Sequence, residues 1–477
     1  MIHIPILRAG CPYRSLNIRH VRHVQTGEPI AEVSQSNRGL IAKDLTTAAH
    51  HKRALESLSV SELVAICKKA AHFFTDSVLP LGAESQSPGD YIRQLSATTG
   101  MPESLCRNNM NKIRTVLEEM EAVLGGLTRG LNLSVLDAGW GVQDKRPLSY
   151  VRQTNVLGAV LPSNSPGVHS LWLPAIPMKT PLVLKPGGEE PWTPYRIAQA
   201  LIASDCPPES FGFYPTDYTG AAEILLRSGR SMLFGGESTV APWKTDPRVQ
   251  IHGPGRSKIV IANDEISGWD KYLDVMVASI VDNGGRSCIN ASGIWAPAHG
   301  REIAAALANR LAQIDALPLD DPQAKIAAFS NPKFAHQLSS LIDDQLKTPG
   351  ASDVTAEVRG GGRLVEKAGC TYLLPTVIWC ESPEHPLANT EYLFPFVSVV
   401  EVPQPEILER IGSTLVVSAY TEDEAFINEL LGSPDVERLN LGAISTNQIA
   451  WDQPHEGNLF EHLYRQRAFQ KTGTRRS

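Results

Sequence analysis

Several features are missing from this 477-residue chain, and each absence excludes a class of protein. No apolar run approaches the roughly 20 residues needed to cross a bilayer. We therefore expect no membrane span. Residues Met1–Gly10 lack the long apolar stretch and the small-residue cleavage site of a secretory signal. The formal net charge of −7 argues against nucleic acid as the main partner, because phosphate binding needs a basic surface.

Paired cysteines are also missing. The 7 cysteines are scattered without a Cys-x-x-Cys pair, and an odd number in a large chain favours reduced thiols over a disulfide framework. We therefore expect a cytoplasmic protein. The sequence contains no Walker A pattern, no His-Glu-x-x-His and no cluster of metal-ligating cysteines, so it predicts no metal site.

What is present is the composition of an ordinary globular protein, with 42% hydrophobic and 20% charged residues. Its length predicts two or three domains. Residues 1–50 show no clear pattern. Ser59 and Glu62 have the spacing of a capping box, and helical periodicity follows through Leu63–Phe74. A second helix is predicted near Ile113–Leu124, so the N-terminal part is expected to be largely helical.

From about residue 155 short apolar runs alternate with helical stretches. This alternation favours a parallel sheet covered by helices on both faces, so we predict an α/β fold. The predicted strands are Val156–Leu161, Leu182–Leu184, Met232–Phe234, Ile259–Ile261 and Gly293–Ala296. The predicted helices are Thr193–Ala203, Thr219–Leu226 and Arg301–Leu311.

Two segments follow predicted strands and carry polar groups. The loop Leu161–Gly167 is at minimum a turn, but loops at the carboxyl ends of parallel strands face the ligand crevice. Asn164 in that loop could offer its amide to an oxyanion. The next strand ends in Lys185-Pro186, which is either a solvated strand end or a lysine at the crevice that binds a nucleotide ribose.

The segment Asn283–Cys288 places a cysteine after paired glycines, which allow the backbone to bend closely around a bound group. Most free cysteines are inert core residues, whereas one that follows such a turn can point into a cleft. The thiolate is the reactive form, so the pKa of Cys288 would have to fall below about 8.5. Arg286 is the one residue of this segment that would lower it.

The segment Ile251–Lys258 contains a Gly-x-Gly, but Lys258 stands where a dinucleotide fingerprint needs its third glycine. We therefore reject a standard fingerprint here. Taken alone, His252 in this segment is a structural or surface residue.

In this order and spacing, these segments resemble the aldehyde dehydrogenase superfamily from about Arg152 to Asn447. One matching block alone is weak evidence, whereas eight in sequence order are strong. The blocks are Gly158–Asn164, Leu184-Lys185-Pro186, Phe234-Gly235-Gly236-Glu237, Asn283–Cys288, Gly361-Gly362 with Gly369 and Pro375–Val377, Glu391–Pro395, Leu415–Thr421 and Gly442–Asn447.

The resemblance implies a role for each of these residues. Cys288 would be the nucleophile, and Asn164 with the backbone N–H of Cys288 would bind the oxyanion. The Lys185-Pro186 motif would bind the adenosine ribose and Glu391 the nicotinamide ribose. The pair Gly235-Gly236 would approach the cofactor pyrophosphate.

One position departs from the family pattern. In hydrolytic members the segment equivalent to His252–Arg256 carries a glutamate that activates water, and here that position is His252. Members that pass the acyl group to coenzyme A, or that reduce acyl-thioesters to aldehydes, resemble this chain in lacking the glutamate, and its Glu391–Pro395 block looks like theirs. CoA-linked chemistry is thus favoured, with hydrolysis assisted by His252 as the alternative, since a histidine pKa lies near neutrality. A binding protein that has lost catalysis is a third reading.

The resemblance also implies the domain plan. Residues 1–256 would form a Rossmann-type NAD(P)-binding domain with a helical N-terminal part and an oligomerisation hairpin at about 130–153. Residues 257–446 would form the catalytic domain, and 447–477 an oligomerisation tail of a homodimer or homotetramer. Glu189 and Glu190 would repel a 2′-phosphate if they face the ribose, which favours NAD, with NADP as the alternative. The substrates would be a small aldehyde or an acyl-CoA, with coenzyme A as co-substrate.

Overall fold

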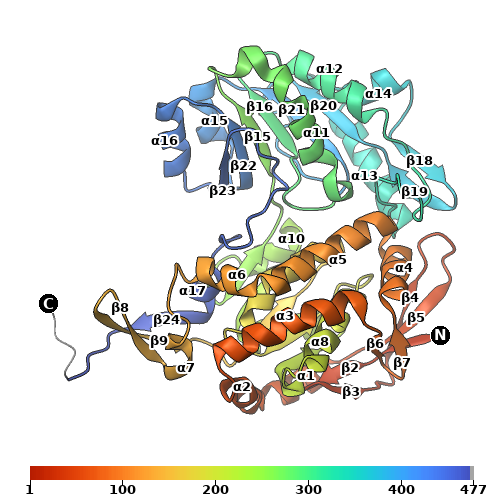
Figure 1. Ribbon diagram of the computed structural model, residues 1–477. Coiled ribbons are helices and arrows are strands. Elements are labelled where there is room, and N and C mark those ends of the chain that lie inside the picture. The colour runs from red at the N-terminus through yellow and green to blue at the C-terminus, as the bar shows by residue number, and fades with distance from the viewer. Residues whose placement is uncertain (473–477) are drawn as a thin grey trace.

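The computed structural model, which describes residues 1–472, has two lobes, each built on a seven-stranded sheet (Figure 1). Helices cover both faces of each sheet, so the predicted α/β class is confirmed. The chain passes from the first sheet to the second between His252 and Lys258. Within the described residues no helix is both long and apolar enough to cross a bilayer.

The first sheet is parallel across five strands and ends in an antiparallel edge made by the N-terminus. Its strands, in spatial order, are β14 (Val249–His252), β13 (Gly229–Phe234), β10 (Val156–Val160), β11 (Leu182–Lys185), β12 (Phe211–Phe213), β2 (Ile6–Arg8) and β3 (Cys11–Tyr13). The three middle strands β10, β11 and β12 are short and almost wholly buried, as expected for a sheet covered on both faces.

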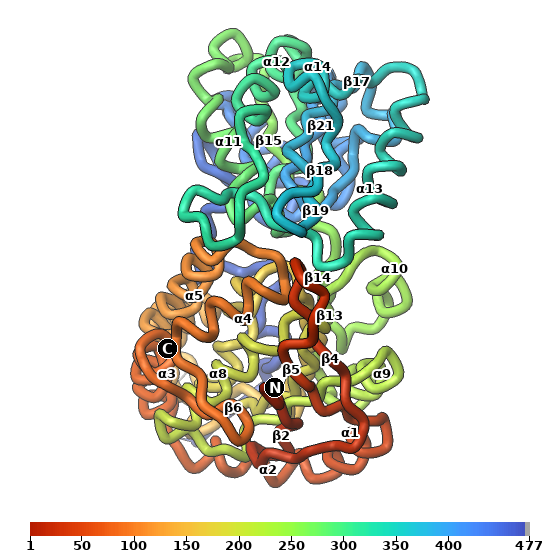
Figure 2. The backbone as a smooth tube through the Cα atoms, turned by 90° about the vertical axis from the view of Figure 1, so that its right-hand side faces the viewer, coloured from red at the N-terminus to blue at the C-terminus, as the bar shows by residue number. Residues whose placement is uncertain are grey.

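Two groups of helices cover this sheet. One face carries the largest apolar core, to which α3 (Val60–Asp76), α5 (Glu103–Glu118) and α8 (Trp192–Ala203) contribute. The opposite face is covered by α1 (Arg38–Leu45), α2 (Ala48–Glu56) and α9 (Tyr218–Arg227). Figures 1 and 2 both place α5 at the junction with the other lobe.

The second sheet is parallel except at β17. Its order is β17 (Ala351–Asp353), β20 (Thr376–Cys380), β21 (Phe396–Glu401), β16 (Gly293–Ala296), β15 (Lys258–Ile261), β22 (Thr414–Tyr420) and β23 (Val436–Leu441). The helices α11 (Leu273–Val281) and α12 (Gly300–Leu311) cover one face. The other face is covered by α13 (Pro332–Gln345), α15 (Gln404–Arg410) and α16 (Glu424–Gly432).

The predicted strands and helices from residue 155 onward all form, with ends within a few residues of those expected. The N-terminal part differs more. Residues 1–34 contain five strands, of which β1 (Ile2–Ile4), β4 (Ile18–Arg22) and β5 (Pro29–Ser34) make a separate sheet. The helix predicted near Ile113–Leu124 is broken at Glu119, whose φ of −91° and ψ of 20° end α5 before α6 (Met120–Leu127) begins.

The remaining elements are short. They are α4 (Pro88–Thr99), α7 (Val135–Ala138), α10 (Glu237–Val240), α14 (Val354–Arg359), α17 (Leu459–Leu463), β6 (Leu79–Leu81), β7 (Glu84–Gln86), β18 (Leu364–Lys367) and β19 (Cys370–Leu373).

Another sheet of three strands projects from the side of the lower lobe (Figure 1). The hairpin β8 (Trp140–Gln143) and β9 (Arg146–Arg152) pairs with β24 (Tyr464–Arg467) from the C-terminal segment. The apolar residues of this segment do not lie open to solvent, because Leu459, Phe460, Leu463 and Tyr464 are all buried in the core of the first lobe. These apolar residues of the C-terminal segment are therefore covered by packing within the same chain.

Candidate active site

Four of the residues singled out in the sequence lie at one edge of the first sheet. Asn164 follows β10, Lys185 ends β11, Gly235 follows β13 and His252 ends β14. These strands are parallel and in register, with Val160 beside Lys185 and Phe234 beside His252. Their carboxyl ends therefore meet at the same edge, where ligand crevices of open α/β sheets lie.

The second lobe adds the predicted site residues Cys288 and Glu391 and lines a cavity of about 590 Å³ against this edge. The cavity brings together most of the predicted site residues: Asn164, Gly235, Gly236, His252, Cys288 and Glu391. Lys185 and Pro186 do not line it, although Glu189 just after them does. A second cavity of about 380 Å³ also has Cys288 in its wall, so the cysteine stands between two cavities.

The loop that carries Cys288 has an unusual backbone. Asn283, Gly284 and Gly285 have φ values of 58°, 69° and 66°, which place three successive residues in the left-handed region. A Cβ on Gly285 would come within 3.0 Å of the backbone of Phe394 and Pro395. Gly285 is therefore needed for a close approach to the chain's own Glu391–Pro395 segment.

Asn164 reaches across the lobes to this loop. Its Nδ2 donates a hydrogen bond of 2.7 Å to the carbonyl oxygen of Arg286. The neighbouring Ser165 accepts from Asn283 Nδ2 at 3.0 Å, and Asn283 Oδ1 accepts from Asn109 of α5 at 2.6 Å. An amide nitrogen has two N–H groups, so the bond to Arg286 leaves one N–H of Asn164 unused.

Burial raises the pKa of the Cys288 thiol well above its ordinary value, and the nearby carboxylates of Glu456 and Glu391 raise it further. The lowering expected from Arg286 does not occur, because its guanidinium turns away and donates to the carbonyl of Thr99 at 2.6 Å. Cys288 is therefore a neutral thiol here, and a group that accepts its proton is needed before it can attack a carbonyl.

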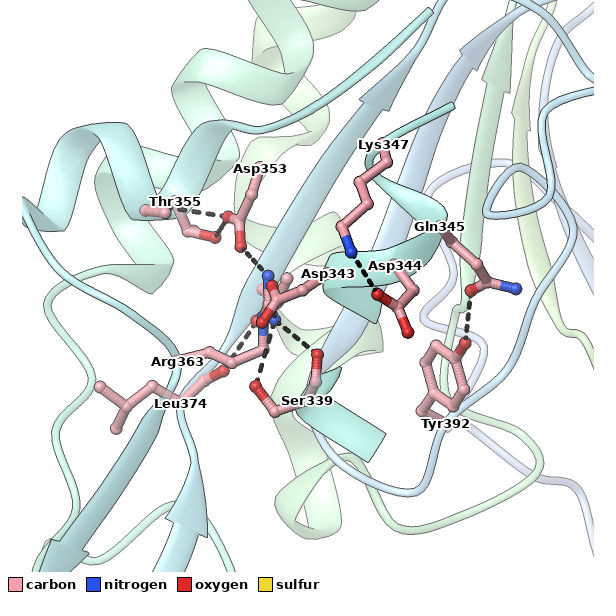
Figure 3. A network of polar contacts seen from close by, with 12 residues as sticks. Ser339, Asp343, Asp344, Gln345, Lys347, Asp353, Thr355, Arg363, Leu374 and Tyr392 are labelled. Atoms are coloured by element: carbon pink, nitrogen blue, oxygen red, sulfur yellow. Dashed lines mark hydrogen bonds and ion pairs between the residues drawn. The ribbon is translucent and has the colours of Figure 1, made fainter. Parts of the chain in front are cut away.

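Glu391 is held by backbone. Its Oε2 accepts from the N–H of Arg256 at 2.5 Å, while burial raises its pKa to about 7. The adjacent Tyr392, which also lines the cavity, donates its hydroxyl to Gln345 Oε1 of α13 at 3.1 Å (Figure 3). The same helix is fixed from its other side by the buried Arg363, which pairs with Asp343 and Asp353 (Figure 3).

Lys185 lies in a cluster of charges. Burial lowers its pKa, as does the cation of Arg19, which reaches over from β4. Arg19 pairs with Glu189 at 3.0 Å. Glu190 is 1% exposed and pairs with His169 at 2.9 Å, so it does not face the cavity. The expected preference for NAD rested on repulsion of the 2′-phosphate of NADP by Glu189 and Glu190. That argument no longer holds, because Glu190 is buried and the charge of Glu189 is paired with Arg19.

His252 has a partner that sequence inspection missed. Its Nδ1 contacts the carboxylate of Glu456, and its ring stacks on Phe234 with centroids 4.3 Å apart. The ring of His455 lies on its other side, at 6.3 Å and within 15° of parallel. One ligand atom from each of His252, His455 and Glu456 lies within 4.8 Å of the others, so these three side chains could together hold a metal ion. The only signal in the sequence was two adjacent titratable residues between Pro454 and Gly457.

The residues present fit a nicotinamide dinucleotide. A single cavity joins Glu189 and Gly236 to Glu391 and Cys288, and its volume lies in the range of cofactor sites. Gly236 is exposed, and a Cβ there would have no atom within 4 Å, so its backbone is open to a ligand.

A model of the aldehyde dehydrogenase family matches residues 14–414, which includes most of the N-terminal region that the sequence left unassigned. No curated protein sequence matches the chain.

Solved structures of similar fold cover almost the whole chain at low identity. A 3,6-anhydro-L-galactose dehydrogenase in complex with NAP is 13% identical with a TM-score of 0.78, covering 98% of this chain and 99% of that one. An NADP-dependent enzyme of E. coli is 15% identical with a TM-score of 0.77, covering 98% and 97%. An NAD-dependent aldehyde dehydrogenase of Sinorhizobium meliloti is 15% identical with a TM-score of 0.77, covering 98% and 94%. These likenesses confirm the predicted aldehyde dehydrogenase-like fold.

Proposed function

Because the chain belongs to the aldehyde dehydrogenase family of NAD(P)-dependent oxidoreductases, we propose that it converts aldehydes and acyl groups through a thioester on Cys288. The position of this cysteine carries the proposal. Cys288 is in the wall of two cavities, one joined to the carboxyl edge of the first sheet and one leading away from it. A carbonyl substrate in the second cavity would meet the sulfur on the side opposite the cofactor groove.

The chemistry begins with attack of the Cys288 sulfur on the carbonyl carbon. The oxyanion that forms would be stabilised by the second N–H of Asn164, whose first N–H is bonded to the carbonyl of Arg286, and by the backbone N–H of Cys288. Lys185 and Glu391 would hold the two riboses of a bound nicotinamide dinucleotide, and the pair Gly235-Gly236 its pyrophosphate. When bound, that cofactor supplies the hydride acceptor, and loss of hydride leaves a thioester on Cys288.

Coenzyme A is the proposed acceptor of the acyl group. Hydrolytic members of the family activate water with a glutamate, and this chain has His252 at that position. His252 is 3% exposed, and its ring stacks on the rings of Phe234 and His455. The second cavity, at about 380 Å³, offers room for a thiol to approach the thioester. One observation favours hydrolysis as a second candidate, namely that His252 is paired with the carboxylate of Glu456.

Product analysis distinguishes the two acceptors. Purified protein is given a panel of aldehydes with NAD or NADP, with and without coenzyme A, and the products are identified by mass spectrometry. We expect acyl-CoA to form, and turnover to require coenzyme A. Equal rates without coenzyme A, with a free acid as the product, would instead establish the hydrolytic reaction.

A cysteine variant tests the thioester itself. Cys288→Ser should remove turnover almost completely with every acceptor, because a serine hydroxyl is a much weaker nucleophile at neutral pH. Cys11→Ser is the matched control, since Cys11 is exposed on the edge strand β3, in the first lobe. Retention of most activity in Cys288→Ser would refute the proposal.

We also propose that the protein forms a homo-oligomer through the three-stranded sheet β8–β9–β24. Its outer strand β8 leaves one row of backbone groups unpaired within the described residues, and exposed strand edges favour pairing with another chain. Analytical ultracentrifugation of the protein and of a variant with Val142→Pro in β8 would test this. The expected result is a dimer or tetramer that dissociates in the variant.

A further inference from the structure

The second cavity, which has Cys288 in its wall, is lined mostly by polar residues. A cavity for plain alkyl chains is expected to be apolar, because covering a polar group without giving it a partner costs free energy. Here the wall contains two side chains of opposite formal charge, Lys112 and Asp282, together with amides such as Gln448. The lining therefore indicates a polar substrate.

Lys112 lies on α5, the helix at the junction of the two lobes (Figures 1 and 2). Its side chain is accessible, and within residues 1–472 its ammonium group has no hydrogen bond and no ion pair. The surrounding protein lowers the pKa of Lys112, because the ammonium is less fully hydrated here than on an open surface. An incompletely hydrated cation without a partner is a binding group for an anion.

Asp282 lies between α11 and the Cys288 loop, with its backbone anchored and its side chain free. Its carbonyl oxygen accepts a hydrogen bond of 2.9 Å from Asn290 Nδ2, which also donates to the carbonyl of Ser279 at 3.1 Å. Its carboxylate is accessible and has no hydrogen bond or ion pair in the described part of the chain. Burial raises the pKa of Asp282, so the carboxylate too is incompletely hydrated.

The two charges are neighbours that do not touch. After burial, each is the largest influence on the pKa of the other, since Asp282 raises the pKa of Lys112 and Lys112 lowers that of Asp282. Lys325 also acts on Asp282, but it does not line the cavity. No ion pair joins Lys112 to Asp282, so a gap remains between the ammonium and the carboxylate in the cavity wall.

The sign of each charge restricts what can occupy this gap. A ligand with one charge is attracted by one of the two side chains and repelled by the other, so its gain is largely cancelled. A ligand with an ammonium and a carboxylate close together pairs with both side chains at once. The α-amino acid group has this arrangement, because both of its charges are attached to one carbon atom.

We propose that the second cavity selects aldehydes that carry an α-amino acid group, with Lys112 binding the carboxylate and Asp282 the ammonium. The aldehyde end of such a semialdehyde points to Cys288, and the charged end lies at Lys112 and Asp282. This inference rests on the proposed role of Cys288 as the nucleophile, and it adds the substrate class to that role.

A matched set of aldehydes tests the proposal. Aspartate 4-semialdehyde carries both charges, succinic semialdehyde lacks the ammonium, 3-aminopropanal lacks the carboxylate, and propanal lacks both. The same set lengthened by one methylene group covers a second chain length. With coenzyme A and either cofactor present, we expect kcat/KM for the doubly charged aldehyde to exceed that of each analogue by about tenfold or more at one of the two lengths, the effect of one charge-assisted hydrogen bond.

Charge-removing variants give opposite results with the singly charged aldehydes. Lys112→Met should reduce the preference for the doubly charged aldehyde over propanal by about tenfold, and should improve the use of 3-aminopropanal, because a repulsive cation is removed. Asp282→Asn should reduce the same preference and improve the use of succinic semialdehyde. A residue with a structural role alone would not reverse its effect with the charge of the substrate.

Two variants serve as matched controls that should leave all these ratios unchanged. Arg107→Met removes an exposed cation from the same helix as Lys112, outside both cavities that contain Cys288. Asp274→Asn removes a carboxylate of α11 that pairs with Arg310.

If propanal is used as well as the doubly charged aldehyde at both lengths, or if each variant changes all four substrates alike, the substrate class is refuted while the thioester chemistry stands. If Cys288→Ser keeps its activity with these aldehydes, the proposed function itself fails.

Discussion

Gly255 lies against the carbonyl oxygen of Cys288, so closely that a Cβ at residue 255 would come within 3.0 Å of that oxygen. The amide of Leu415 also donates to the carbonyl of Gly255 at 2.7 Å, which fixes the glycine to β22. The backbone of Cys288, the proposed nucleophile, thus lies directly against the segment that carries His252. The Gly-Pro-Gly of that segment, unsuited to a dinucleotide fingerprint, has a structural use here.

This contact predicts the effect of a single methyl group. Gly255→Ala should displace the Cys288 loop by a few tenths of an ångström to about 1 Å, and should reduce kcat/KM by about 10²-fold, since a misplacement of that size costs this much. Gly432→Ala is the control, because a Cβ there meets no atom within 4 Å. Steady-state kinetics and thermal unfolding of both variants measure the effect. Wild-type activity in Gly255→Ala would show that the contact does not position the cysteine.

Asn164 is expected to contribute through its second N–H. Asn164→Ala should reduce kcat by roughly 10²–10³-fold, since removal of one oxyanion donor costs about 2.7–4 kcal/mol. Asn440→Ala provides the control, because it also removes an amide hydrogen bond, of 3.1 Å to Ser418, in the second sheet. A rise in KM with unchanged kcat in Asn164→Ala would instead assign the amide to substrate binding and not to the oxyanion.

Arg19 is expected to influence the choice between NAD and NADP. It lies over Gly188, where a Cβ would come within 3.0 Å of its guanidinium, and beside Lys185. These two cations would attract the 2′-phosphate of NADP once Glu189 turns aside. Arg19→Ala should therefore weaken NADP binding by about tenfold, the size of a lost charge-assisted hydrogen bond, with little effect on NAD.

Arg22→Ala is the control for this measurement, since Arg22 lies on the same strand and donates to the carbonyl of Gly27. Fluorescence titration with both cofactors gives the dissociation constants. An equal loss of NAD and NADP affinity in Arg19→Ala would show that Arg19 shapes the site without reading the phosphate.

Glu391 should make the stability of the cofactor-free protein depend on pH. Burial raises its pKa from 4.5 to about 7, so the folded protein favours the neutral carboxyl. For a folded-state pKa above the unfolded one, the stabilising contribution is complete below pH 4.5 and is lost as the pH rises through 7. Relative to wild type, Glu391→Gln should therefore gain up to about 3 kcal/mol of unfolding free energy between pH 4.5 and pH 8. Urea denaturation at several pH values gives the difference, and parallel curves would contradict it.

Local pattern was sufficient for some elements and insufficient for others. β10, β11 and β16 are short apolar runs flanked by turn residues, and their placement follows from burial on both faces of a parallel sheet. The first 34 residues gave no such pattern, because β3 is an exposed edge strand and β4 is mostly exposed. The break at Glu119 also escaped prediction, since neither proline nor glycine marks it.

For the site, the sequence alone determined the candidate chemistry: a cysteine after paired glycines, an amide and a lysine at strand ends, and a histidine where hydrolytic relatives carry a glutamate. The turns and strand ends are local signals, because turn and strand propensities act over a few residues, whereas the meaning of the histidine came from the resemblance to the aldehyde dehydrogenase family. Only the tertiary structure decided the electrostatics. Glu456 reaches His252 from 204 positions away along the chain, and Arg286 turns from the thiol it was expected to activate. Charges act through space, and packing of the two lobes sets which of them meet.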